Sequence, residues 1–87
     1  VIADDAHVLG LGGVIGGEDT GVSESTTDVL LECAWFSPEG IGATGRRHMI
    51  NTDARARFER GVDPLALEPM VEVATAMILE LCGGEAS

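Results

Sequence analysis

Residues 63–84, DPLALEPMVEVATAMILELCGG, carry the strongest secondary-structure signal of this chain. Asp63-Pro64 is a helix-start signal, and Gly83-Gly84 is a C-cap signal. Between them, apolar side chains recur with the i, i+3, i+4, i+7 spacing of one helical face. These are Leu67, Met70, Val71, Ala74, Met77, Ile78 and Leu81. We therefore predict an amphipathic helix from Pro64 to Cys82, with this face packed on a sheet.

The segment just before this helix, NTDARARFERGVDP at residues 51–64, concentrates positive charge. It holds three of the five basic residues in a chain whose formal net charge is -10. Charge concentrated in this way holds buried carboxylates, shapes a pocket or meets an anion. We predict a strand over residues 54–60, and we expect Arg57, Glu59 and Arg60 to form a structural salt-bridge network.

Further upstream the pattern indicates strands. Residues 1–5 and 7–11 predict two short strands, and the polar stretch 19–28 predicts a loop. The clearest strand is VLLECAWF at residues 29–36. Both of its faces are largely apolar, so we expect it to lie centrally in a sheet.

A second, weaker helix is predicted to follow this strand. Ser37-Pro38 is an N-cap followed by proline at the first helical position, and the helix is expected to end near Met49. Three glycines lie within it, each costing roughly 1 kcal/mol relative to alanine. His48, beside two arginines, is expected to complement the helix dipole.

The glycine run GLGGVIGG at residues 10–17 supports three interpretations. A dinucleotide fingerprint would need the last glycine of G-x-G-x-x-G and a following helix, and neither is present. The plain interpretation is a hairpin in which glycines permit bulges and close backbone approach. In the third interpretation, the glycines leave room for a ligand beside a strand.

Glu32 is the most informative single residue. On the predicted strand it shares a face with Leu30, Ala34 and Phe36, where an unpaired carboxylate would be costly. One explanation is a structural ion pair with an arginine. The other is a carboxylate in a pocket wall that accepts a hydrogen bond from a ligand. By contrast, Thr52-Asp53 by itself is typical of turn chemistry.

Composition limits the classes of function. The chain has no lysine and is strongly acidic, which argues against a module that grips nucleic-acid phosphates by itself. Cys33 and Cys82 lack metal-type spacing and are predicted to be buried free thiols. Neither a membrane span nor a signal peptide is recognisable. No Ser nucleophile elbow or metal-ligand cluster is present, so chemistry here would use a positioned water.

Five segments, in this order and spacing, resemble one family. They are Gly16-Gly17-Glu18, Gly21-Val22-Ser23-Glu24, residues 29–36, Thr52-Asp53-Ala54 and the stretch from Arg57 to Pro64. Together they resemble the bacterial phenylalanyl-tRNA synthetase beta subunit across essentially all 87 residues. The region resembled is the C-terminal half of the B3/B4 editing domain, so we expect residues 1–87 to be an incomplete domain. The fold this implies is α+β, a three-layer ββα-type sandwich only partly present here.

The resemblance implies an editing function, the hydrolysis of tyrosine wrongly attached to phenylalanine tRNA. Glu32 matches the carboxylate that recognises the tyrosine hydroxyl, and Gly16, Thr52 and Ala54 match residues lining the editing pocket. Thr52 is expected to hydrogen-bond the substrate or the attacking water, and is our candidate catalytic residue. Two departures lie close to it: Asn51 where histidine is frequent, and Met49 where glycine is common.

The resemblance also implies partners and a parent reaction. The parent joins phenylalanine to its tRNA using ATP and magnesium, with the synthetic site on the alpha subunit of an alpha2-beta2 heterotetramer. We expect no cofactor in this segment, no membrane, and a cytoplasmic location. The rest of the beta subunit is expected to supply further pocket residues, so the isolated 87 residues should neither aminoacylate nor efficiently deacylate. The alternative is a structural or interaction module without an editing role.

Overall fold

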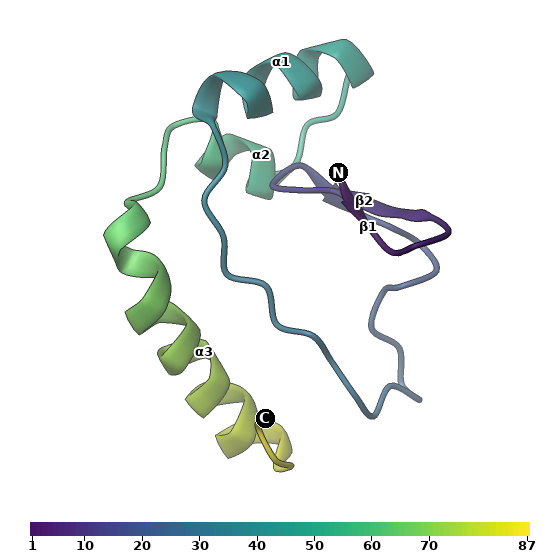
Figure 1. The fold of residues 1–87 in the computed structure, drawn as a ribbon, viewed down its shortest axis with the longest axis vertical. Helices are drawn as coiled ribbons and strands as arrows, with labels where there is room; N and C mark the ends of the chain where they lie inside the picture. The colour runs from purple at the N-terminus through teal and green to yellow at the C-terminus, as the bar shows by residue number, and fades with distance from the viewer.

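A computed structural model describes all residues from Val1 to Ser87 and shows an α+β fold (Figure 1). Three short strands form one antiparallel sheet in the order β1-β2-β3. Helices α1 and α2 lie beside this sheet, and α3 extends away from them (Figure 1). The element bounds are β1 Ile2–Ala3, β2 Val8–Leu11, β3 Ile15–Gly16, α1 Pro38–His48, α2 Asp53–Phe58, the 3-10 turn η1 Pro64–Ala66, and α3 Leu67–Cys82. The predicted α+β class is confirmed.

The sheet is a meander built on two tight connections. In the first, the Asp4 carboxylate accepts hydrogen bonds from the backbone N–H groups of Ala6 at 2.8 Å and His7 at 2.6 Å. These bonds lower the pKa of Asp4 below its ordinary value. In the second, residues 12–14 turn the chain from β2 into β3. The predicted strands over 1–5 and 7–11 are therefore confirmed, with shorter bounds for both.

The small core is built around this second turn. Val14 and Ile41 are its only buried apolar residues, at 2% and 4% exposure. A Cβ at Gly12 would lie 2.7 Å from the Phe36 ring, and one at Gly13 would lie 2.7 Å from Ile41 Cδ1. The glycines thus let two large side chains pack directly on the turn, as the plain interpretation of the glycine run predicts. The run contains β3 and is followed by a loop, so the dinucleotide interpretation lacks the helix it requires.

Helix α1 begins and ends where its sequence predicts. The Ser37 hydroxyl accepts a hydrogen bond from the Gly40 N–H at 3.2 Å, with proline at the first position. The helix ends with Met49 in the left-handed region, at φ 54°. His48 lies in the last turn with two arginines, where a cation complements the helix dipole.

The strand predicted over residues 29–36 is wrong. The segment runs beside the other elements without a regular structure and pairs with none of the three strands (Figure 1). A strand requires a neighbour that takes up its backbone hydrogen bonds, and no segment of this chain supplies one. Instead, the Cys33 thiol donates to the Leu67 carbonyl at 3.5 Å.

The strand predicted over residues 54–60 is also wrong, because these residues begin in helix α2. The Thr52 hydroxyl accepts from the Arg55 N–H and acts as N-cap, which starts a helical turn. The predicted network of Arg57, Glu59 and Arg60 is absent as well. Glu59 pairs with Arg55 instead, since residues four apart lie on the same helical face.

Helix α3 has its predicted end at Cys82 but not its predicted burial. Its first turn, Pro64–Ala66, is 3-10, and the Asp63 carboxylate accepts from the Leu65 N–H at 3.0 Å. No residue of α3 is buried, because little of the chain packs against it. The free thiols Cys33 and Cys82 are exposed for the same reason, which corrects the expectation of burial. None of the helices combines the length and the apolarity that a bilayer span requires.

Candidate functional site

A cavity of about 830 Å³ lies beside the sheet and is walled by segments far apart in the sequence. The β2–β3 hairpin, part of the polar loop, the irregular segment 28–36 and helix α2 all contribute lining residues. Gly16, Glu32 and Ala54 each line this cavity, from the hairpin, the irregular segment and the helix respectively. The fold therefore brings three of the four candidate residues to one hollow.

Gly16 marks open space in this wall. A Cβ built on Gly16, which lines the hollow, would have no atom within 4 Å, so a side chain there would meet open space rather than packed protein. Its neighbour differs completely, because a Cβ on Gly17 would lie 2.2 Å from the Leu9 carbonyl oxygen. Gly17 is therefore needed for close backbone approach, whereas the absence of a side chain at Gly16 leaves the cavity free.

Glu32 lines the cavity from an exposed position. No arginine lies within ion-pair distance of it, so the structural ion pair considered for this residue is not formed. Its predicted burial is also wrong, because the segment carrying it is not enclosed by neighbouring strands. Asp19 and Asp28 line the same cavity. Three carboxylates in one wall favour a ligand that brings hydrogen-bond donors or positive charge.

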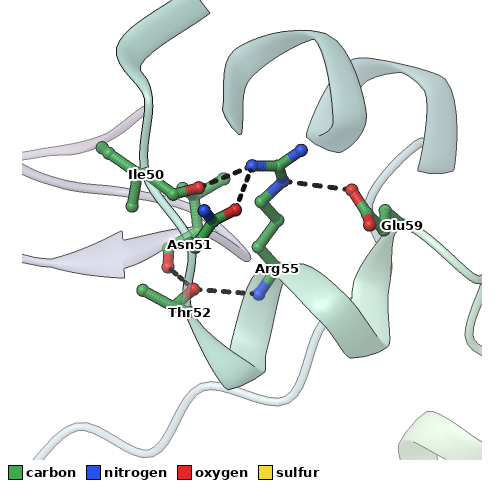
Figure 2. Close-up of polar contacts among 6 residues, drawn as sticks. Ile50, Asn51, Thr52, Arg55 and Glu59 are labelled. Carbon is green, nitrogen blue, oxygen red and sulfur yellow. Dashed lines mark hydrogen bonds and ion pairs between the residues drawn. The ribbon is translucent and has the colours of Figure 1, made fainter. Parts of the chain in front are cut away.

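Thr52 lies outside the cavity lining and holds its wall together. Its hydroxyl donates to the Val14 carbonyl oxygen at 2.5 Å and accepts from the Arg55 N–H at 3.1 Å (Figure 2). A hydroxyl has one proton and two lone pairs, so these bonds leave one lone pair free. Thr52 therefore fixes α2, which carries Ala54, against the turn that leads into β3.

Arg55 was not singled out by sequence reasoning, yet it organises this corner. Its Nη1 donates to the Ile50 carbonyl at 2.7 Å and to Asn51 Oδ1 at 2.8 Å, and its Nε donates to Glu59 at 3.1 Å (Figure 2). A Cβ on Gly45 would lie 2.2 Å from Arg55 Nε. In the sequence, two features point to Arg55: its spacing of four residues from Glu59 and the glycines of α1.

Almost the whole chain matches one known protein family. Residues 1–83 match the family described as the B3/4 domain. The chain belongs to the B3/4 domain family. No solved structure matches it.

Curated proteins similar to this B3/4 chain carry the name phenylalanine–tRNA ligase beta subunit. The protein of Novosphingobium aromaticivorans is 55% identical over 87 residues, covering 100% of this chain and 11% of its own length. The protein of Rhodospirillum rubrum is 59% identical over 86 residues, and that of Pectobacterium atrosepticum is 51% identical over 86 residues. Each of these matches covers 99% of this chain and 11% of the relative's length. The chain thus spans about a ninth of these relatives, at 11% of their length.

Within this B3/4 chain, the site divides into a wall and its support. Gly16, Glu32 and Ala54 face the hollow, and Phe58 joins them from the last turn of α2. Phe58 meets Phe36 edge to face, with ring centroids 5.2 Å apart. Thr52 and Arg55 support the wall from behind. The family resemblance implied Gly16, Glu32 and Ala54 as wall residues, whereas the support depends on contacts that only the folded chain displays.

Proposed function

We propose that this chain is part of a phenylalanine–tRNA ligase beta subunit and forms one wall of a site that hydrolyses Tyr-tRNA made in error. The observation that carries the proposal is the single cavity that Gly16, Glu32 and Ala54 share. Its size, about 830 Å³, lies in the range of small-molecule pockets. The names of the similar proteins support the parent enzyme.

In this proposal, each wall residue has a role that its chemistry can perform. Glu32 accepts a hydrogen bond from the tyrosine hydroxyl. The open space at Gly16 and the short side chain of Ala54 leave room for the aromatic ring. An oriented water hydrolyses the ester, assisted by the terminal ribose hydroxyls of the tRNA. Thr52 remains our candidate for contacting the substrate or that water, through the lone pair its two bonds leave free.

Discrimination against phenylalanine requires that water be excluded from Glu32. A site built around a hydroxyl can reject the analogue lacking it by a factor on the order of 10⁴, because a buried polar group is then left unpaired. An exposed carboxylate keeps water as its partner and gains no such selectivity. We therefore propose that residues 1–87 are the C-terminal half of the editing domain and that the rest of the beta subunit covers the cavity.

The parent enzyme supplies the other activities. We propose that it acts in the cytoplasm as an alpha2-beta2 heterotetramer and attaches phenylalanine to its tRNA. ATP and magnesium would be used at the alpha subunit's synthetic site, with no cofactor held by this segment. The isolated chain should not efficiently deacylate Tyr-tRNA, and turnover near that of the full subunit would refute this.

The test is Glu32→Gln and Glu32→Ala in the full-length beta subunit assembled with its alpha subunit. We expect Tyr-tRNA hydrolysis to fall at least about tenfold without a lowered melting temperature, because Glu32 forms no ion pair with any residue of this chain that its replacement could break. Intact hydrolysis in both variants would overturn the proposal.

A second candidate, a structural module without editing, is favoured by the exposed apolar side chains. Only 4 of 87 residues are buried, and Leu30, Trp35 and Met77 are among the large apolar residues left exposed. Exposed apolar side chains of this kind pack against another part of a larger protein or against a partner protein. Under this alternative, the Glu32 variants lower the melting temperature and leave Tyr-tRNA hydrolysis intact.

A further inference from the structure

Most arginines of this chain form no ion pair with its carboxylates. Five arginines face fifteen acidic residues, yet Arg55 is the only arginine with a carboxylate within ion-pair distance. The other four are exposed and take no part in any ion pair or side-chain hydrogen bond of the structure. They are Arg46, Arg47, Arg57 and Arg60. In so acidic a chain, unpaired cations are available to an anion supplied from outside.

Arg57 is the one that helix α2 places beside the cavity. Ala54 and Phe58 line the cavity, so they define the side of α2 that faces it. At about 100° per residue, Arg57 lies on one flank of this side and Arg55 on the other. The Arg55 flank is covered by α1 through Gly45. The Arg57 flank is exposed, so Arg57 is accessible from outside and adjoins the lining residues Ala54 and Phe58 without itself lining the cavity.

The negative charge of the cavity wall makes a nearby cation useful for binding an anionic ligand. Asp19, Asp28 and Glu32 line the wall, and their negative charge opposes the approach of any anion. An aminoacyl ester on a tRNA 3′ end cannot enter without bringing its phosphodiesters to the rim. A guanidinium matches a phosphate with paired, charge-assisted hydrogen bonds. We propose that Arg57 binds a phosphodiester of the tRNA 3′-terminal nucleotides while the aminoacyl group occupies the cavity; this rests on the proposed function.

The experiment compares Arg57→Gln with the matched control Arg47→Gln in the full-length beta subunit assembled with alpha. Arg47 is also exposed and unpaired. Gly45 marks the side of α1 that faces Arg55 on α2, and Arg47 lies about 200° around α1 from Gly45, on the opposite side of the helix. For Arg57→Gln, we expect the KM for Tyr-tRNA to rise about tenfold, with kcat within about twofold. The salt dependence of kcat/KM should lose about one unit of slope. Arg57→Lys should restore the salt slope, because it keeps the charge, but only part of the KM, because it lacks the paired donors. Arg47→Gln should leave both quantities unchanged.

Two results would overturn the phosphate contact. One is an Arg57→Gln variant with wild-type KM and salt slope. The other is a lowered melting temperature with an unchanged salt slope, which would mean that Arg57 pairs with a carboxylate elsewhere in the subunit. If Glu32→Gln abolishes hydrolysis while Arg57→Gln has no effect, the contact alone fails. If wild-type enzyme does not hydrolyse Tyr-tRNA, or Glu32→Gln leaves hydrolysis intact, the proposed function fails and this inference with it.

Discussion

The Thr52 hydroxyl donates a hydrogen bond of 2.5 Å to the Val14 carbonyl oxygen, joining positions 38 apart in the sequence. Val14 is the most buried apolar residue of the core, at 2% exposure, and Thr52 is the N-cap of α2. This one bond therefore ties the hairpin that carries Gly16 to the helix that carries Ala54. The geometry of the proposed pocket wall depends on it.

Replacing Thr52 by valine should destabilise this junction. The substitution keeps the shape of the side chain but removes both the bond to Val14 and the cap on Arg55 N–H. We expect a loss of about 1–2 kcal/mol, measured from amide hydrogen exchange of α2 in the full-length subunit. Thr52→Ser keeps the hydroxyl and is the control. Equal protection in the two variants would contradict the assignment.

Gly16 and Gly17 should respond in opposite ways to an added side chain. Gly16→Val should leave stability within about 0.5 kcal/mol of wild type, because nothing lies within 4 Å of the new Cβ. Under the proposed function, the same variant should lose Tyr-tRNA hydrolysis, since it adds bulk to a residue that lines the cavity. Gly17→Ala should cost about 1–3 kcal/mol, because its Cβ would lie 2.2 Å from the Leu9 carbonyl oxygen. Urea unfolding and a deacylation assay separate the two effects.

Gly45 should be intolerant of alanine. The added Cβ would lie 2.2 Å from Arg55 Nε and would displace the guanidinium from Ile50 and Asn51. We expect a cost of about 1–3 kcal/mol despite the better helix propensity of alanine. The matched control is Gly40→Ala in the same helix, where the nearest atoms are those of Ser37 at 3.6 Å. If both variants are equally stable, Arg55 does not depend on this close approach.

Met49→Gly should stabilise the end of α1. Met49 is 89% exposed, so its replacement loses little packing. It also adopts φ 54°, a left-handed conformation that strains methionine and that glycine adopts freely. We expect a gain of about 0.5–1 kcal/mol in the local stability of α1, read from hydrogen exchange. Met49→Ala should show no such gain, because alanine has the same strain.

The β1–β2 turn should weaken in acid. Bonds from the Ala6 and His7 N–H groups hold the pKa of Asp4 below its ordinary value of 3.8. A carboxyl whose pKa is lowered on folding stabilises the folded state above its unfolded pKa, and this contribution is lost as pH falls through the folded value. An NMR titration of Asp4 should show a midpoint below 3.8. In Asp4→Asn, protection of the Ala6 and His7 amides should no longer vary with pH in this range.

Local signals in the sequence predicted the features that depend on neighbouring residues. Ser37-Pro38 started α1, and Gly83 ended α3, because caps act within one turn of the chain. Segment 54–60 was misassigned because the cap at Thr52 outweighed its alternation. Glu32 and Ala54 were recognised as candidate wall residues, but only the folded chain shows that they line one cavity.

By itself, the sequence determined the α+β class, the positions of α1 and α3 and the residue types available to a pocket, since propensity and capping operate over a few residues. Tertiary structure alone decided that segment 29–36 has no partner strand, that Arg55 rather than Arg57 pairs with Glu59, and that Thr52 bonds to Val14. The reason is that a backbone or side-chain polar group is satisfied by whatever partner the fold brings within reach. That partner can lie dozens of positions away, where no local pattern records it.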